Sequence, residues 1–295
     1  MKVTIIGLGL IGGSMALDLR KAGIASFIAG IDVNPAHAAK AIDLKLVDSI
    51  ESENVALSTS DIIITATPVS ALVGLLPSIL DMAHQNALVI DAGSTKTQIC
   101  RALANHPKRS QFVAAHPLAG TENSGPEAAY AGLFRGKTNI ICESEKSSDE
   151  SLKLAHTLFD ALGLKTIYME AEEHDKHVAY VSHLSHVSSF LLGQTVLDIE
   201  KDEKNIFDLA SSGFASTVRL AKSSPDMWTP IFEQNAEYLG QALMEYIMHL
   251  QKFHYLLMKK DTKELHKIMS RANEIRRVLD GIELKNLKPE LITNK

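Results

Sequence analysis

His116 is the residue of this chain whose type and position best suit proton transfer. It lies in residues 114–125, AAHPLAGTENSG, where an apolar run ends and a polar turn begins. An imidazole titrates near neutral pH and can accept a proton from a reacting hydroxyl group. Ligands of parallel α/β sheets bind beyond the carboxyl ends of the strands, so we expect His116 at the rim of a pocket. The alternative is an ordinary turn residue.

A glycine-rich turn precedes this histidine near the start of the chain. Gly7, Gly9 and Gly12 form G-x-G-x-x-G between an apolar run and a helical pattern. Gly7 would permit the tight turn, Gly9 the close approach of a pyrophosphate, and Gly12 the packing of helix on strand. The N–H groups at the helix start, around Leu10 and Ile11, would face the phosphates. The sequence therefore predicts a dinucleotide site, the alternative being a turn used only for packing.

The expected second strand ends in Asp32, twenty residues after Gly12. A carboxylate there accepts hydrogen bonds from ribose hydroxyls and repels a 2′-phosphate. The next residues, VNPAHAAK, contain no arginine, so we expect NAD rather than NADP. Thr67 and Pro68 follow another strand and are predicted to line the same cofactor site.

Three other polar residues lie at the ends of predicted elements. Ser94 and Lys96 belong to DAGSTK, at a turn into a helix. Ser94 is predicted to cap that helix or to reach the ligand, and Lys96 to be solvated in its first turn. Arg219 carries a planar guanidinium that suits a substrate carboxylate, although an exposed or ion-paired arginine is the commoner case.

A metal site is not expected, although four histidines lie close together in the sequence. On a continuous helix the pair His174 and His177 would point away from the pair His183 and His186. Cys100 and Cys142 form no metal-binding spacing and no disulfide framework.

The composition is that of an ordinary soluble protein of 295 residues with a net charge of −5. That charge gives no basic surface for nucleic acid or for an anionic membrane. The chain opens on an apolar run without a signal peptide, and no apolar run reaches the roughly 18 residues of a membrane span. We expect a cytoplasmic enzyme.

Seven short apolar runs alternate with helical patterns over residues 1–165. Continuous apolar runs indicate strands covered on both faces, so this region is predicted to be a Rossmann-type, doubly wound parallel α/β domain. A helix over 147–162 is expected to begin with a capping box of Ser147 and Glu150.

Residues 166–285 are expected to be helical, and 286–295 a surface tail. One helix should run through 171–197, another should start at Ser224 and Pro225, and a third should start with Asp261 and Glu264 as a capping box. Two apolar seams at alternating spacings of three and four are predicted to form an antiparallel hairpin. They serve either core packing or a homodimer interface: Ala236, Leu239, Leu243, Tyr246, Leu250, Phe253 and Leu257; then Leu265, Ile268, Ala272, Ile275 and Leu279.

Several motifs, in this order, resemble those of prephenate dehydrogenases of tyrosine biosynthesis: GLGLIGGSMALDLR, DAGSTK, HPLAGTENSG, HDKHVAYVSHLSH and RLAKSSPDMW. The resemblance extends over roughly residues 2–280. It implies an NAD-dependent oxidative decarboxylation of prephenate to 4-hydroxyphenylpyruvate, with no metal, and a dimer formed by the helical domain. Hydride leaves the ring carbinol carbon, and the ring carboxylate leaves as CO₂.

The resemblance also implies roles for single residues. His116 would accept the proton of the ring hydroxyl, and Ser94 would bridge that histidine and the nicotinamide region. Arg219 would grip a substrate carboxylate and His186 would bind substrate. Glu122, with its neighbour Thr121, would lie at the mouth of the pocket.

His183 and Trp228 match motif positions, but we predict structural roles for them. Two departures from the family's pattern are Ser185, which replaces a proline, and the pair Ala215 and Ser216, which replaces a basic–acidic pair. An acid that would orient Arg219 is therefore missing from its usual place.

Three other functions remain open from the sequence. An arogenate dehydrogenase would use the same mechanism on a substrate with another side chain. A β-hydroxyacid dehydrogenase would use a lysine of the helical domain, where this chain has histidines. A non-catalytic NAD-sensing module would need the glycines and Asp32 but neither His116 nor Arg219.

Overall fold

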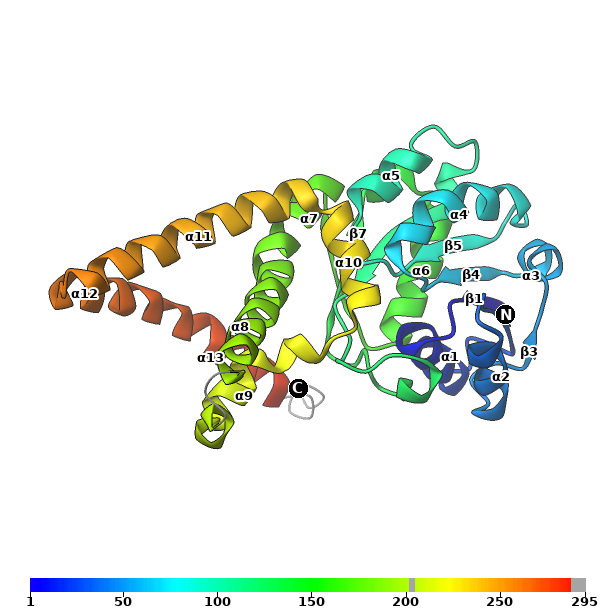
Figure 1. Cartoon of the computed structure of the whole chain (residues 1–295). Helices are drawn as coiled ribbons and strands as arrows, with labels where there is room; N and C mark the ends of the chain where they lie inside the picture. The colour runs from blue at the N-terminus through cyan, green and yellow to red at the C-terminus, as the bar shows by residue number, and fades with distance from the viewer. Residues whose placement is uncertain (202–204, 288–295) are drawn as a thin grey trace. The chain divides into compact units, whose positions relative to one another are not determined.

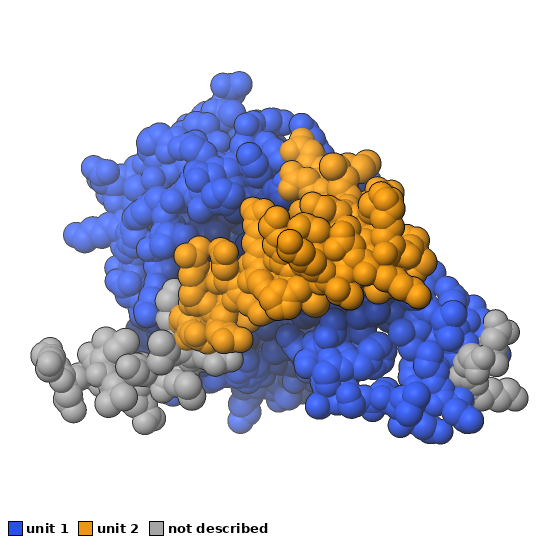
Figure 2. All heavy atoms as spheres, turned by 90° about the vertical axis from the view of Figure 1, so that its left-hand side faces the viewer, with its two compact units in different colours: residues 1–239 blue, residues 240–295 orange. Residues whose placement is uncertain are grey.

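The computed structural model describes residues 1–201 and 205–287. The expected tail of 286–295 lies outside the described residues from position 288 onward. The chain divides into two compact units, residues 1–239 and residues 240–295 (Figure 2). The expected domain boundary at residue 165 stays a prediction.

An eight-stranded sheet in the order β3-β2-β1-β4-β5-β6-β7-β8 forms the centre of the first unit. The first six strands in this order are mutually parallel, while β7 and β8 run antiparallel to them. The strand bounds are β1 (Lys2–Ile6), β2 (Phe27–Ile31), β3 (Ser49–Ile50), β4 (Ile62–Thr65), β5 (Leu88–Asp91), β6 (Phe112–Pro117), β7 (Thr138–Cys142) and β8 (Lys165–Met169). The Rossmann-type fold is thus confirmed, with β3 as a short strand that no apolar run predicted.

Helices cover both faces of this sheet, as Figure 1 shows. Alternate residues of β4 enter two separate cores: Ile62 and Ile64 face one, and Ile63 faces the other. The first core includes side chains of α1 (Leu10–Lys21) and α6 (Asp149–Ala161). The second includes α3 (Glu53–Thr59), α4 (Val69–Met82), α5 (Thr97–Leu103) and α10 (Pro225–Gln234), while α2 (Pro35–Asp43) lies beside β2 and β3.

The observed helix starts agree with the capping signals, with one shift. Ser148, rather than Ser147, caps α6 by accepting from the N–H of Ser151. The Ser147 hydroxyl donates instead to the carbonyl of Phe112. Ser224 precedes Pro225 at the start of α10 as expected. Asp261 accepts from the N–H of Glu264 and so caps α12 (Thr262–Ala272).

The single helix expected over 171–197 is interrupted. α7 (Ala171–Val178) passes through a π-helical turn (Ala179–His183) into α8 (Leu184–Glu200). The wider turn rotates the side chains that follow it, and both His174 and His183 are buried while His177 is exposed. His174 and His177 both lie in α7, before this turn, so the turn changes only how His183 and His186 are placed relative to them. α9 (Ser212–Val218) and a short helical turn (Arg219–Lys222) lead to α10.

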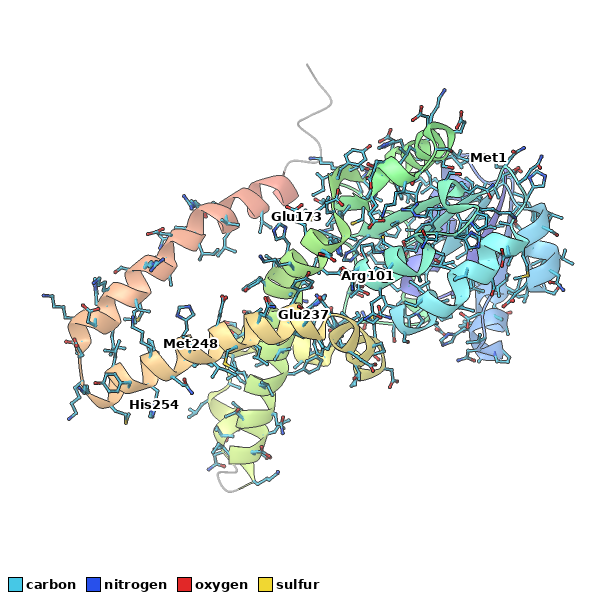
Figure 3. The ribbon with its side chains drawn as sticks, turned by 90° about the horizontal axis from the view of Figure 1, so that it is seen from above. Met1, Arg101, Glu173, Glu237, Met248 and His254 are labelled. Carbon is cyan, nitrogen blue, oxygen red and sulfur yellow. The ribbon has the colours of Figure 1, made fainter. Side chains whose placement is uncertain are left out.

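The second unit contains most of α11 (Ala236–Met258), then α12 and α13 (Arg276–Leu287). Much of the predicted apolar seam is exposed in the single chain: Leu250, Phe253, Leu257, Ile275 and Leu279. Met248 and His254 also project from α11 (Figure 3). These helices therefore leave an apolar surface uncovered. In the described part of the chain, no helix is both long enough and apolar enough to cross a membrane.

We expect Gly12→Ala to destabilise the first unit by roughly 1–3 kcal/mol, because the added Cβ would lie 2.0 Å from the Gly7 carbonyl oxygen. Gly240→Ala is the matched control. A Cβ at Gly240 meets nothing within 4 Å in helix α11, and alanine there should stabilise by roughly 0.5–1 kcal/mol. Chemical denaturation of both variants measures the difference. Equal stability of the Gly12 variant and wild type would contradict the close packing of α1 on β1.

Candidate active site

The turn between β1 and α1 carries three glycines. A side chain would find room at one of them and would clash at the other two. Gly7 has φ of +93°, and a Cβ on it would lie 2.5 Å from the carbonyl oxygen of Ala66. A Cβ on Gly12 would strike the Gly7 carbonyl, whereas one on Gly9 would meet nothing within 4 Å. The start of α1 is therefore open at Gly9, where an anion can approach its N–H groups.

Asp32 and Thr67 flank this opening. The Asp32 carboxylate accepts from the N–H groups of Leu8 and Asn34, both at 2.8 Å, which fixes it against the glycine turn. The buried hydroxyl of Thr67 has no hydrogen-bond partner among the described residues. An unsatisfied hydroxyl beside the turn fits a polar ligand.

Three other predicted cofactor residues differ in exposure. The side chains of Leu10 and Ile11 pack into the first core, so only their backbone can face a ligand. Pro68 is exposed just before α4.

His116, on β6, belongs to a hydrogen-bonded chain of three side chains. Its Nδ1 lies 2.8 Å from Nε2 of His174, whose Nδ1 lies 2.8 Å from an oxygen of Asp175. Burial alone would raise the pKa of Asp175, but hydrogen bonds from His174 and Thr97 outweigh it and lower that pKa. Asp175 is thus a carboxylate and can only accept.

The ionised Asp175 fixes the tautomers of both histidines. His174 carries its proton on Nδ1 to donate to Asp175, so its Nε2 accepts. His116 must then donate from Nδ1, which leaves its Nε2 without a proton and available as a base. Burial first, and then the positive potentials of His174, Lys96 and His183, hold the pKa of His116 well below its usual value. The ring is therefore neutral at neutral pH.

Asp175 is itself held by the start of α5. Its two oxygens accept from the N–H groups of Lys96 and Thr97, both at 2.8 Å. Its carbonyl oxygen accepts from the side chain of Asn235, which also contacts His183 Nδ1 at 3.1 Å. Burial is the main cause that lowers the pKa of His183, to about 4.

Lys96 is fully buried, so the prediction that it is solvated was wrong. Its ammonium group donates to Asp91 and, at 2.7 Å, to the carbonyl of Ala115. Ser94, two residues earlier, is partly buried and does not cap α5. The turn from β5 into α5 therefore buries its lysine fully and its serine only in part.

Arg219 and Glu122 meet at the surface of the first unit. An Arg219 nitrogen lies 3.7 Å from a Glu122 oxygen, and the arginine side chain is 57% exposed. Thr121 accepts from the N–H of Asn123, which shapes the turn that carries Glu122. Glu122 is thus a carboxylate that pairs with Arg219, although position 216 carries a serine.

His186 stacks on the buried Trp228, with ring centroids 3.5 Å apart. His183 contacts the edge of the same indole, whose N–H has no partner among the described residues. The pKa of His186 is lowered, mainly by burial and also by the positive charge of Arg219. A series of contacts thus connects His116 to Arg219 through His174, Asp175, Asn235, His183, Trp228 and His186.

Sequence reasoning missed His174, Asp175, Asn235 and Asp91. The adjacent histidine and aspartate of HDKH were a usable signal, whereas Asp91 and Asn235 carry none without the fold. Within residues 1–201 and 205–287, no three or more His, Cys, Asp or Glu residues are placed to hold a metal ion.

The chain matches family models over nearly its whole length. Residues 15–168 match "Prephenate dehydrogenase, nucleotide-binding domain", and residues 170–271 match "Prephenate dehydrogenase, dimerization domain". The chain is 32% identical to a prephenate dehydrogenase of Lactococcus lactis, with 95% of this chain and 77% of that protein covered.

Solved structures agree. The prephenate dehydrogenase of Aquifex aeolicus, in complex with hydroxyphenyl propionate and NAD⁺, superposes with a TM-score of 0.86 at 31% identity, covering 95% of this chain and 98% of that one. The arogenate dehydrogenase of Synechocystis gives 0.76 at 30% identity, covering 95% and 100%. The chain belongs to the prephenate dehydrogenase family.

Proposed function

We propose that this NAD-dependent oxidoreductase converts prephenate to 4-hydroxyphenylpyruvate, with His116 as the base. The observation that carries the proposal is the hydrogen-bonded row of His116, His174 and Asp175, which leaves one imidazole nitrogen free and unprotonated. It lies at the end of β6, on the sheet edge that also carries the glycine turn. The side chain of the helical region that contacts His116 is His174, where a β-hydroxyacid dehydrogenase would use a lysine.

The residues around the glycine turn fit NAD. The N–H groups at the start of α1 would hold the diphosphate at Gly9, and Asp32 would bind the adenosine ribose. Thr67 would use its unsatisfied hydroxyl on the cofactor. NAD supplies the hydride acceptor for the reaction.

His116 takes the proton of the ring hydroxyl as the carbinol carbon gives up its hydride. The resulting ketone is conjugated with the two ring double bonds, which link it to the carbon that carries the carboxylate. The bond to that carboxylate then breaks, CO₂ leaves, and its electron pair enters the ring, which becomes aromatic. The oxygen, now a phenoxide, recovers the proton from His116. No net proton is consumed, and Asp175 stabilises the intervening imidazolium through His174.

We assign substrate binding to Arg219, His186, Glu122 and Thr121. Arg219 would bind a substrate carboxylate, with Glu122 orienting it when the site is empty. His186, held on Trp228, lies close enough to feel the charge of Arg219. Ser94 would contact the nicotinamide side of His116.

We also propose a cytoplasmic homodimer. The exposed apolar residues of α11 and α13 make up a face that a second copy would cover, in agreement with the dimerization-domain description of residues 170–271. Both cysteines are buried and unpaired, as is usual in a reducing compartment.

The decisive experiment supplies the purified protein with NAD and either prephenate or arogenate. We expect prephenate to give NADH and CO₂ in equal amounts. We also expect the kcat/KM for prephenate to be larger than that for arogenate. A larger kcat/KM for arogenate would make arogenate the substrate and leave the proposed mechanism unchanged. Tight NAD binding without turnover of either compound would instead support a cofactor-sensing module.

We expect His116→Asn to lower kcat by about 10²–10⁴-fold and to leave NAD affinity within a few-fold, because the base is lost while the glycine turn is intact. In wild type, the lowered pKa keeps His116 unprotonated, so kcat/KM should fall only below pH 6.5. Steady-state kinetics across pH test both points. Normal turnover by the variant would remove His116 from the mechanism.

We expect Arg219→Ala to raise the KM for substrate by a factor equivalent to roughly 2–3 kcal/mol, because a substrate carboxylate loses a charge-assisted bond. The matched control is Arg101→Ala, since Arg101 is also exposed and paired with a glutamate, Glu172. The control should retain wild-type KM. An unchanged KM in the Arg219 variant would exclude this role.

A further inference from the structure

Lys96 and Asp91 form a buried ion pair directly beneath His116. Both side chains are fully buried, and the pair joins the end of β5 to the start of α5. Burying two charges is costly, and a pair of apolar side chains in their place is often as stable or more so. A buried pair is therefore weak as a stabilising device, and its position calls for another explanation.

The contacts of Lys96 converge on the base. Its ammonium donates to the carbonyl of Ala115, which is the peptide group that leads into His116. Asp91 holds the same residue from its other side by accepting from the Ala115 N–H at 3.2 Å. The pair thus clamps the backbone of β6 immediately before the imidazole.

The backbone N–H of Lys96 contacts Asp175, at the opposite end of the hydrogen-bonded row from His116. This N–H donates to Asp175, the carboxylate that fixes the tautomer of His174. A single residue therefore holds both the peptide before His116 and the carboxylate behind His174. Asp91 also accepts from the N–H of Gly93, which fixes the turn that carries Ser94.

We propose that Lys96 is a positioning residue of the active site, which through its pair with Asp91 sets the orientation of His116 and keeps a positive charge beneath the ring. The proposal deepens the proposed function and rests on it. The charged and titratable groups that face His116 are His174 and Asp175 from α7, His183 from the π-helical turn, and Lys96 with Asp91 from β5 and α5.

The charge of Lys96 has a measurable consequence. It lowers the pKa of His116, together with burial and the neighbouring histidines. Removal of the ammonium should therefore raise that pKa, so that activity is lost at a higher pH as the solution is acidified. A residue that only stabilised the fold would not move this limb of the pH profile.

The test uses two double variants that leave no lone buried charge. The double variant with Asp91→Asn and Lys96→Met loses the ammonium charge and also the hydrogen bond to the Ala115 carbonyl. Asp91→Asn with Lys96→Gln removes the charge but keeps an amide that can donate. We expect kcat to fall about 10–100-fold in the methionine variant and less in the glutamine variant, with the KM for NAD unchanged in both. In both variants, the loss of activity on the acidic side of the pH profile (the acid limb) should occur at a higher pH than in wild type.

Leu158→Ala is the matched control, because Leu158 is buried in α6 within the first core and takes no part in the hydrogen bonds that join His116, His174 and Asp175. It should lower the melting temperature while kcat and the acid limb stay as in wild type. Wild-type kcat and pH profile in both folded double variants would overturn the proposal. Failure of both variants to fold, at a melting-temperature loss far beyond that of the control, would make Lys96 a fold determinant and overturn it as well.

A second readout does not depend on turnover. Histidine NMR of the free protein, with the His116 signal assigned by the His116→Asn variant, follows the ring titration directly. We expect its pKa to rise in both double variants. If wild type failed to oxidise prephenate or arogenate, the proposed function would fall, while an unchanged His116 titration would refute the Lys96 inference on its own.

Discussion

The active site depends on one buried carboxylate. Asp175 has little contact with water, so its charge must be balanced by donors, and the structure provides two backbone N–H groups and His174 Nδ1. These three bonds attach α7 to the start of α5 and leave His174 only one tautomer. The state of His116 follows from that tautomer. The charge of Asp175 therefore determines both the contact between α7 and the start of α5 and the tautomer of His116, the proposed base.

The parts of the molecule that are encoded locally could be predicted from the sequence. The glycine turn needs only a strand, three glycines and a helix in order, and the close approaches at Gly7 and Gly12 show why other residues do not fit. His116 was predicted because β6 ends there and parallel strands present their ends on one edge. Arg219 and Glu122 followed from motifs, and the structure brings them within 3.7 Å.

The parts that depend on long-range contacts could not be predicted. Lys96 was expected in solvent because a first-turn lysine is usually solvated, and only Asp91 and Ala115 explain its burial. His174 lies 58 residues from His116, and Asp175 lies 79 residues from Lys96. The π-helical turn was not predicted because its sequence, AYVSH, contains no helix breaker.

The choice between prephenate and arogenate must lie outside the row of His116, His174 and Asp175, because both substrates present the same ring, hydroxyl and ring carboxylate to it. They differ in a side chain that ends in either a keto acid or an amino acid. The groups that can distinguish an added ammonium are those with charge at the site's surface, Arg219 and Glu122. Both side chains carry a carboxylate that Arg219 would bind in the proposed site, and only arogenate adds an ammonium that Glu122 would meet. In the proposed site, the balance between these two charges, rather than the row of His116, His174 and Asp175, would therefore set the preference.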